Sequence, residues 1–320
     1  MNILGIDTSN YTTSLAWLAT ERGVIEQQKQ LLPVPEGAAG LRQSDAVFHH
    51  VRQLPVLFRQ LSERVGTALR PDAIGVSVSP RPQEGSYMPC FLAGMAAARM
   101  LGDSHGVPVY ETSHQTGHIL AALYSAGCMD WLNADALPFL AFHVSGGTTD
   151  CVRCIPHAEK AVQIEPVSGS LDLKAGQAID RIGLMLGLKF PCGAALEQLA
   201  SESTSEQRMR FQLKDGSCSL SGLQNQCETM YRKGAAPSDI ARYTLNSVAA
   251  VIRAMTEAAA EKTQASSVLY AGGVLSDRLI QNALRRTDLR TAFAEPAFSC
   301  DNAAGVAVYA ARREGFSCRF

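Results

Sequence analysis

The chain has 320 residues, 46% of them hydrophobic and 18% charged, and its formal net charge is -1. This is an ordinary globular composition, with enough mass for one large or two moderate domains. The near balance of basic and acidic residues argues against a protein that holds nucleic acid alone by neutralising phosphates, although a partner could supply a basic surface.

Nine cysteines are scattered along the chain, an odd number that predicts reduced thiols in a cytoplasmic protein rather than a disulfide framework. Cys151 and Cys154 form a lone C-x-x-C on an expected strand, where an odd separation points them to opposite faces. A strand pattern follows Met1 directly, so no signal peptide is expected. Since no apolar run approaches the roughly 20 residues that span a bilayer, we expect a soluble protein without a membrane partner.

The first half of the chain is expected to alternate strands and helices. Ser44 is the expected N-cap of the first helix, and Pro55 falls inside it, where it could kink the helix. The predicted elements are strands over 3–6, 14–18 and 24–32, a helix over 44–65, a strand over 73–78, a helix over 91–101, a strand over 107–110 and a helix over 114–125.

The second half repeats this plan. Its predicted elements are strands over 139–144, 150–155 and 162–166, a helix through 178–188, a polar insertion over about 201–234, a helix over 238–263, a strand over 267–271, a helix over 276–286, a strand over 293–295 and a closing helix over 301–313. Both halves read strand, hydroxyl-bearing turn, strand, strand, helix, strand, helix. Such a duplication predicts two lobes with a ligand cleft between them.

Residues 137–150 contain a short apolar run that stops at Ser145, Gly146 and Gly147 and restarts at Thr148. Glycines let the backbone turn tightly and approach a ligand closely. Successive N–H groups in such a turn, backed by hydroxyls, could hold a phosphate. An ordinary β-hairpin with a Gly-Gly turn explains the same residues equally well.

His114 and His118 lie four positions apart, where a predicted strand gives way to a helix. This spacing places both imidazoles on one helical face, within reach of one metal ion. A third ligand would have to come from elsewhere, and two partly buried polar histidines are the plainer explanation.

Three further positions allow two readings each. Asp301 opens the closing helix, either as its N-cap or as the missing carboxylate ligand. Asp180 is expected on the first turn of its helix, where it either complements the helix dipole or accepts hydrogen bonds from a ribose. Gly272 and Gly273 stand between a strand and a helix, as in nucleotide-binding turns, but this signal alone is weak.

Eight short motifs together resemble the universal tRNA threonylcarbamoyladenosine synthase family, long mislabelled as a glycoprotease (peptidase M22). They occur in the family's order and span almost the whole chain. The stretches are 4–9, 114–118, 139–147, 176–180, 191–197, 219–223, 272–274 and 301–304. The protease label lacks support here, because the residues between His114 and His118 include no Glu to act as the base of an H-E-x-x-H site.

The resemblance implies an α/β fold of the actin, Hsp70 and sugar-kinase (ASKHA) type, with two RNase H-like lobes around a nucleotide cleft. It implies one transition metal, iron or zinc, held by His114, His118 and Asp301, and no other catalytic residue. It implies an adenine-nucleotide site, for threonylcarbamoyl-AMP or ATP. The residues assigned to that site are Ser145, Gly146, Gly147, Thr148, Asp180, Gly193, Glu197, Gly272, Gly273 and Asp277.

The sequence also departs from the family pattern. Tyr11 and Thr12 stand where the family usually has an acidic pair, which leaves the role of the turn that also contains Asp7 and Ser9 open. Asp277 replaces an Asn and adds a negative charge beside the expected nucleotide. The other departures are Thr148 for His, Gln177 for Glu, Gln224 for Lys and a longer loop over 81–87. These departures suggest a divergent paralogue.

We therefore expect a first lobe over 1–130 plus 297–320 and a second lobe over 131–296. The leading hypothesis is threonylcarbamoyl transfer to adenosine in tRNA, with partner proteins supplying affinity for RNA. The alternatives are a carbamoyl-type transferase acting on another acceptor, and a non-catalytic nucleotide-binding partner. A homodimer, or a heterodimer with a paralogous ASKHA protein, is also expected.

Overall fold

A computed structural model describes residues 1–9, 11–33, 41–285 and 288–316. The chain divides into two compact units. Unit 1 contains Met1–Ala136, Pro156–Gln163 and Cys300–Phe320, and unit 2 contains Leu137–Ile155 and Ile164–Ser299. Among the described residues, no helix combines the length and the hydropathy that crossing a bilayer requires.

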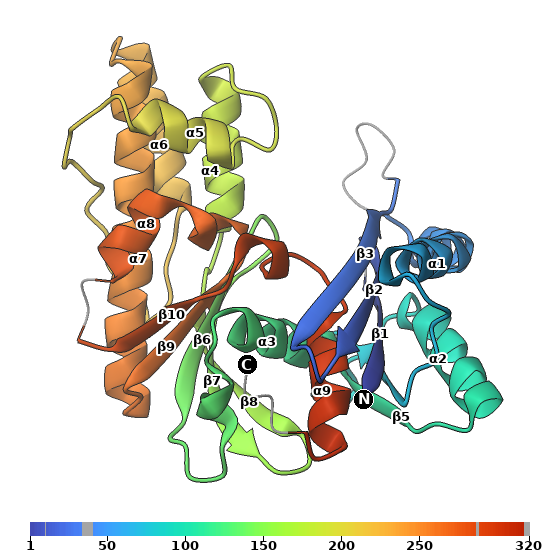
Figure 1. The fold of residues 1–320 in the computed structure, drawn as a ribbon. Coiled ribbons are helices and arrows are strands. Elements are labelled where there is room, and N and C mark those ends of the chain that lie inside the picture. The colour runs from blue at the N-terminus through green and yellow to red at the C-terminus, as the bar shows by residue number, and fades with distance from the viewer. Residues whose placement is uncertain (10, 34–40, 286–287, 317–320) are drawn as a thin grey trace. The chain divides into compact units, whose positions relative to one another are not determined.

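Each unit is built on one sheet (Figure 1). The elements of unit 1 are β1 (Asn2–Ser9), β2 (Thr12–Ala19), β3 (Val24–Leu31), α1 (Gln43–Val65), β4 (Ala73–Ser79), α2 (Phe91–His105), β5 (Val109–Ser113), α3 (His114–Ser125), η1 (Met129–Leu132) and α9 (Ala304–Arg313). Those of unit 2 are β6 (Phe139–Val144), β7 (Thr149–His157), β8 (Ala161–Gly169), α4 (Ala175–Met185), α5 (Gly193–Ala200), α6 (Ser221–Arg232), α7 (Pro237–Thr263), β9 (Ser267–Ala271), η2 (Gly273–Ser276), α8 (Arg278–Leu284), β10 (Arg290–Phe293) and η3 (Pro296–Phe298), and the tip of the β7–β8 hairpin is counted with unit 1.

The two sheets have the same topology. The strand order is β3-β2-β1-β4-β5 in one and, read from the other edge, β8-β7-β6-β9-β10 in the other. In both, the first and second strands are antiparallel, and the first pairs in parallel with the fourth, which pairs in parallel with the fifth. The predicted duplication is therefore confirmed.

In unit 1, helices cover both faces of the sheet (Figure 1). On one face, α1 and α2 bury a cluster of large aliphatic side chains that includes Leu4, Ile6 and Leu61. On the other face, α9 lies directly on the backbone, because β1 and β4 present Gly5 and Gly75 as register partners. A Cβ at either glycine would overlap a carbonyl oxygen of the α9 segment. This contact anchors the segment that begins at Cys300.

In unit 2, the long helix α7 supplies much of the core. Ile240, Val248 and Met255 are fully buried along it and belong to the same apolar cluster as Phe142 and Tyr270 of the sheet. Thr256 reaches the Tyr270 hydroxyl at 2.9 Å, which satisfies that buried polar group.

Several predicted helix boundaries were wrong. The first helix begins at Gln43 with Arg42 at the N-cap position, so Ser44 is not its cap. The closing helix begins at Ala304, and Asp301 lies in the loop before it rather than at its N-cap. Asp180 lies in the middle of α4 rather than on its first turn. In each case several adjacent polar residues could begin a helix, and tertiary contacts decide which one does.

Three other predictions need correction. The polar insertion over 201–234 contains the helix α6, which buries Leu223 and Cys227 and packs the partly buried Met230 against the core of unit 2. The helix expected over 276–286 is a 3-10 turn followed by α8, with its predicted end at Arg286 outside the described residues. The strand expected over 293–295 ends at Phe293, since its pairing with β9 begins at Arg290.

Candidate functional site

His114 and His118 stand at the start of α3 in unit 1. Ser113 is the N-cap of this helix, and its hydroxyl accepts a hydrogen bond from the backbone N–H of Thr116 at 3.1 Å. The cap fixes the point where β5 turns into α3, so both imidazoles project from the first two turns. Their ring centroids lie 4.3 Å apart.

Asp301 completes this group. Its Oδ1 lies 3.5 Å from His114 Nε2 and 3.4 Å from His118 Nε2. The three ligand atoms lie within 4.8 Å of one another, and no other group of three His, Cys, Asp or Glu side chains among the described residues meets this spacing. The closing segment thus brings a carboxylate to two imidazoles from the middle of the chain.

Asp7 binds the ring nitrogen of His114 that does not face Asp301. Its Oδ2 lies 2.6 Å from His114 Nδ1, and its Oδ1 accepts the Ser9 backbone N–H at 2.8 Å. Asp7 is fully buried in β1, two residues before the end of the strand. Since Nδ1–H donates to the carboxylate, Nε2 is the nitrogen that faces Asp301, as in carboxylate–histidine–metal arrangements.

The turn from β1 to β2 contributes one further contact. The Thr12 hydroxyl donates to Oδ2 of Asp301 at 3.1 Å. The side chain of Tyr11 is exposed, and the Ser9 hydroxyl is buried without a hydrogen-bond partner among the described residues. Sequence reasoning left Asp7 and Thr12 without a role. A buried strand that ends in an acid is a usable signal for Asp7, whereas nothing local marks Thr12.

The electrostatics of the group follow from these contacts. Burial alone would lower the pKa of His114, but the carboxylates of Asp7 and Asp301 outweigh it and raise that pKa to about 10. Burial would raise the pKa of Asp301, but the hydrogen bonds and charges of His114 and His118 hold it well below its usual range. A cation bound by these side chains would therefore have to displace a proton.

In unit 2, the side chain of Ser145 forms hydrogen bonds within the turn that follows β6. The Ser145 hydroxyl accepts hydrogen bonds from the backbone N–H groups of Gly147 and Thr148 at 3.3 and 3.2 Å, and lies 3.0 Å from the Thr148 hydroxyl. Gly146 and Gly147 are exposed. The turn presents backbone at the surface, but two of its N–H groups already have an acceptor.

Two close backbone approaches surround this turn. The Gly176 N–H donates to the Ser145 carbonyl at 3.2 Å, and a Cβ on Gly176 would lie 2.6 Å from the Gly146 nitrogen. At Gly272, which has a φ of 106°, a Cβ would overlap the carbonyl oxygen of Val144. The start of α4 and the end of β9 therefore lie directly against the turn, and Gly273 beside them is exposed.

The acidic residues assigned to the nucleotide site all accept backbone hydrogen bonds. Asp180 accepts the Cys192 N–H at 2.8 Å, next to the exposed Gly193. Glu197 accepts the Arg278 N–H at 2.9 Å. Asp277 is buried and is the N-cap of α8, and burial, with a smaller contribution from Glu197, raises its pKa to about 6. These carboxylates order the loops of unit 2.

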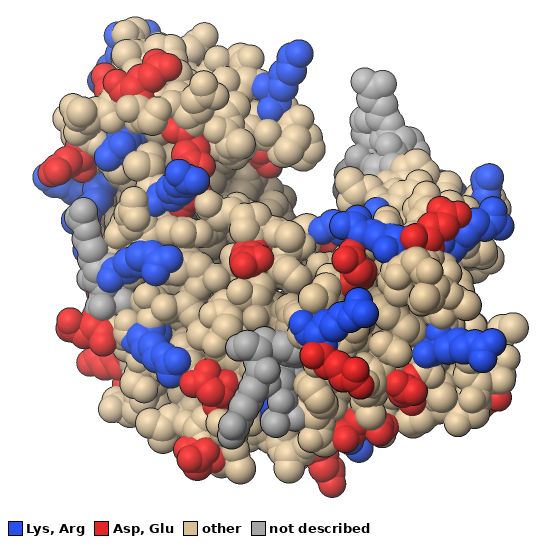
Figure 2. Space-filling view, in the orientation of Figure 1, with Lys and Arg blue, Asp and Glu red and all other residues tan. Residues whose placement is uncertain are grey.

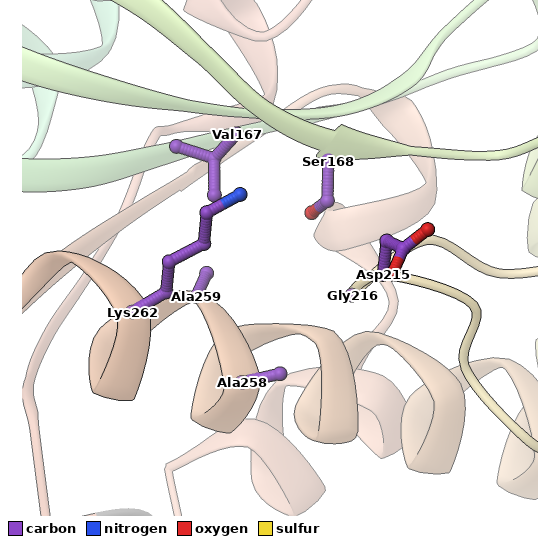
Figure 3. A pocket seen from close by; sticks show the side chains of 7 residues that line it. All are labelled: Val167, Ser168, Asp215, Gly216, Ala258, Ala259 and Lys262. Atoms are coloured by element: carbon purple, nitrogen blue, oxygen red, sulfur yellow. The ribbon is translucent and has the colours of Figure 1, made fainter.

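Unit 2 also contains a pocket of about 250 Å³ between β8 and the end of α7 (Figure 3). In Figure 3 the Lys262 ammonium and the Ser168 hydroxyl point toward one another across it. Its lining residues are Val167, Ser168, Asp215, Gly216, Ala258, Ala259 and Lys262. None of these is a predicted site residue, so the pocket is separate from the groups described above.

The fold is shared by solved structures of low sequence identity. A ROK family glucokinase from Streptomyces griseus, in complex with glucose and AMPPNP, matches with a TM-score of 0.54 and 13% identity over 98% of this chain and 100% of that chain. The (R)-2-hydroxyglutaryl-CoA dehydratase component A of Acidaminococcus fermentans gives a TM-score of 0.53 and 16% identity over 99% and 100% of the two chains. The expected ASKHA fold is confirmed.

Sequence comparison is more specific. The tRNA N6-adenosine threonylcarbamoyltransferase of Aromatoleum aromaticum is 31% identical over 98% of this chain and 91% of its own length. The family model of TsaD, described as tRNA N6-adenosine threonylcarbamoyltransferase, matches residues 24–308. The match covers both units, including the two histidines and Asp301. The chain therefore belongs to the TsaD family of tRNA N6-adenosine threonylcarbamoyltransferases.

Proposed function

We propose that this chain transfers a threonylcarbamoyl group from threonylcarbamoyl-AMP to N6 of an adenosine in tRNA. In this reaction N6 attacks the carbamoyl carbonyl carbon, the bond from that carbon to the AMP phosphate oxygen breaks, N6 loses a proton, and AMP leaves. The observation that carries the proposal is 31% identity with a named transferase over nearly the whole of both chains.

The residues in unit 1 fit one transition metal ion. Two imidazole Nε2 atoms and one carboxylate oxygen converge, and Asp7 fixes the orientation of the first imidazole. We propose that His114, His118 and Asp301 hold iron or zinc. When bound, such a metal would supply Lewis-acid polarisation of the donor's carbonyl group. Asp7 would keep Nε2 of His114 directed at such a metal.

The adenine nucleotide is proposed to contact the glycine-rich backbone of unit 2. The exposed Gly146, Gly147 and Gly273 lie around the start of α4, where backbone can approach a phosphate closely. For the Gly147 and Thr148 N–H groups to bind a phosphate, the hydrogen bonds that they now donate to the Ser145 hydroxyl would have to break. We propose that the two units are the two lobes predicted from the sequence.

We propose that tRNA is held with the help of partner proteins, in the cytoplasm. On the face shown in Figure 2, Lys and Arg side chains are interspersed with Asp and Glu. Mixed charge of this kind supplies little phosphate neutralisation. The formal net charge of -1 agrees with this.

The expected dimer with a second protein of this fold also stays a proposal. Apolar side chains face outward on α1 at Phe48 and Val51, and on α2 at Leu92 and Met100. The two helices pack against one another within unit 1. Large apolar side chains exposed on neighbouring helices favour a protein interface. Light scattering of the purified chain, alone and with a paralogue, tests this proposal.

Complementation tests the function. Expression in a cell that lacks the modified nucleoside, together with the usual partner proteins, should restore it in hydrolysed tRNA analysed by mass spectrometry. Wild type should restore the nucleoside and His114→Ala should not. If wild type expresses as folded protein and restores none, the proposed activity is wrong.

A further inference from the structure

Thr12 is held firmly at the start of β2. Its backbone pairs with Ser9 of β1 on one side and with Leu31 of β3 on the other. The next residue, Thr13, points to the opposite face, where its hydroxyl lies 2.6 Å from Gln53 Oε1 and 2.7 Å from His50 Nδ1 of α1. These contacts fix the register of β2 and therefore the position of the Thr12 side chain.

The Thr12 side chain is 4% exposed, and its hydroxyl donates to only one oxygen of Asp301, Oδ2, at 3.1 Å. The other oxygen, Oδ1, is the one that faces Nε2 of both histidines. A β-branched side chain has few rotamers, so the hydroxyl stays aimed at Oδ2. The two carboxylate oxygens of Asp301 thus have different partners.

We propose that Thr12 is a positioning residue that makes Asp301 a one-oxygen metal ligand. By occupying Oδ2, its hydroxyl leaves Oδ1 alone directed at the metal, and it prevents the carboxylate from turning to chelate with both oxygens. This inference rests on the metal site proposed above. It adds a contact between residues 289 positions apart that no local pattern indicates.

The inference can be tested by titrating purified full-length protein with Co²⁺, whose visible absorption reports coordination number, and by measuring its affinity in competition with a chelator. Thr12→Val keeps the shape of the side chain and removes the donor. We expect a 10- to 100-fold loss of affinity, the usual effect of losing such a supporting hydrogen bond. We also expect weaker visible bands, as for a higher coordination number.

Two variants control this experiment. Thr12→Ser keeps a hydroxyl and should bind Co²⁺ within about threefold of wild type with an unchanged spectrum. Thr20→Val removes a hydroxyl just after β2 that bonds only the Met1 carbonyl, and it should behave as wild type. If Thr12→Val matches wild type in affinity and spectrum, or if Thr12→Ser is as weak as Thr12→Val, the inference is wrong while the metal site stands. If wild type binds no Co²⁺, Zn²⁺ or Fe²⁺, both proposals fall.

Discussion

The two units use one topology to build two different kinds of site. In unit 1 the candidate site consists of side chains: His114 links Asp7 to Asp301, and Thr12 donates directly to Asp301. In unit 2 it consists of backbone, where the turn at Ser145 is packed against glycines. The duplicated sheets therefore fix where each site lies, and the residues at the strand ends decide its chemistry.

This difference predicts that the two sites are sensitive to different kinds of substitution. A side-chain site fails when a functional group is removed, whereas a backbone site fails when a Cβ is added. Gly176 and Gly305 are each the second residue of a helix, and so is Gly222 of α6, where a Cβ would meet nothing within 4 Å. Gly222→Ala is therefore a matched control for both.

The largest effect is expected for Gly305→Ala in unit 1. The added Cβ would overlap the Gly117 carbonyl oxygen and separate α9 from α3. We expect the free energy of unfolding to fall by about 3 kcal/mol or more in urea denaturation, with loss of metal binding because Asp301 precedes α9. A change below about 0.5 kcal/mol, as expected for Gly222→Ala, would contradict the close packing of these helices.

Gly176→Ala should affect unit 2 in the same way but less severely. Its Cβ would lie 2.6 Å from backbone atoms of the 145–146 turn, which can shift at the surface. We expect a loss of about 2 kcal/mol of stability and an adenine-nucleotide affinity at least about tenfold weaker. Fluorescent-nucleotide titration measures this affinity. Metal affinity should not change, and if it falls in parallel, the two sites are not independent.

Asp7→Asn should weaken metal binding with little effect on nucleotide binding. The neutral amide no longer holds the His114 tautomer, so we expect a 10- to 100-fold loss of metal affinity in chelator competition. Asp72→Asn is the control, because Asp72 also bonds a β1 backbone N–H, that of Asn2. Equal metal affinity of Asp7→Asn and wild type would show that Asp7 does not support metal binding.

The smallest effect concerns Asp277. Its pKa of about 6 in the folded protein lies above the ordinary 3.8, so the native state binds more protons than the unfolded state between about pH 4 and 6. The contribution of Asp277 to stability therefore decreases as pH rises through this range. Asp277→Asn keeps an N-cap residue and should remove that decrease, with a gain of about 1 kcal/mol at pH 7.5.

Thermal unfolding of Asp277→Asn and wild type from pH 4 to 8 measures this difference. Parallel stability curves for the two proteins would show that the Asp277 carboxyl is not penalised by burial.

Much of the fold was predictable because it depends on local patterns. Buried strands such as β6 and β9 are short apolar runs between turn residues, and the spacing of His114 and His118 placed both on one face of α3. The helix α6 was missed because its few apolar residues stand among many polar ones, so the segment resembles a polar insertion. The contact from Thr12 to Asp301 could not be predicted, since only the packing of α9 on Gly5 and Gly75 brings those residues together.

That packing has a consequence for biosynthesis. The helix that covers the sheet of unit 1 at Gly5 and Gly75 is α9, so this face stays exposed until residues 304–313 have left the ribosome. All residues of unit 2 are translated before α9. Unit 2 can therefore complete its core while unit 1 still lacks its last helix. The first strands to be translated are thus among the last to be fully buried. In nascent chains stalled before α9, β1 should be accessible to chaperones and proteases.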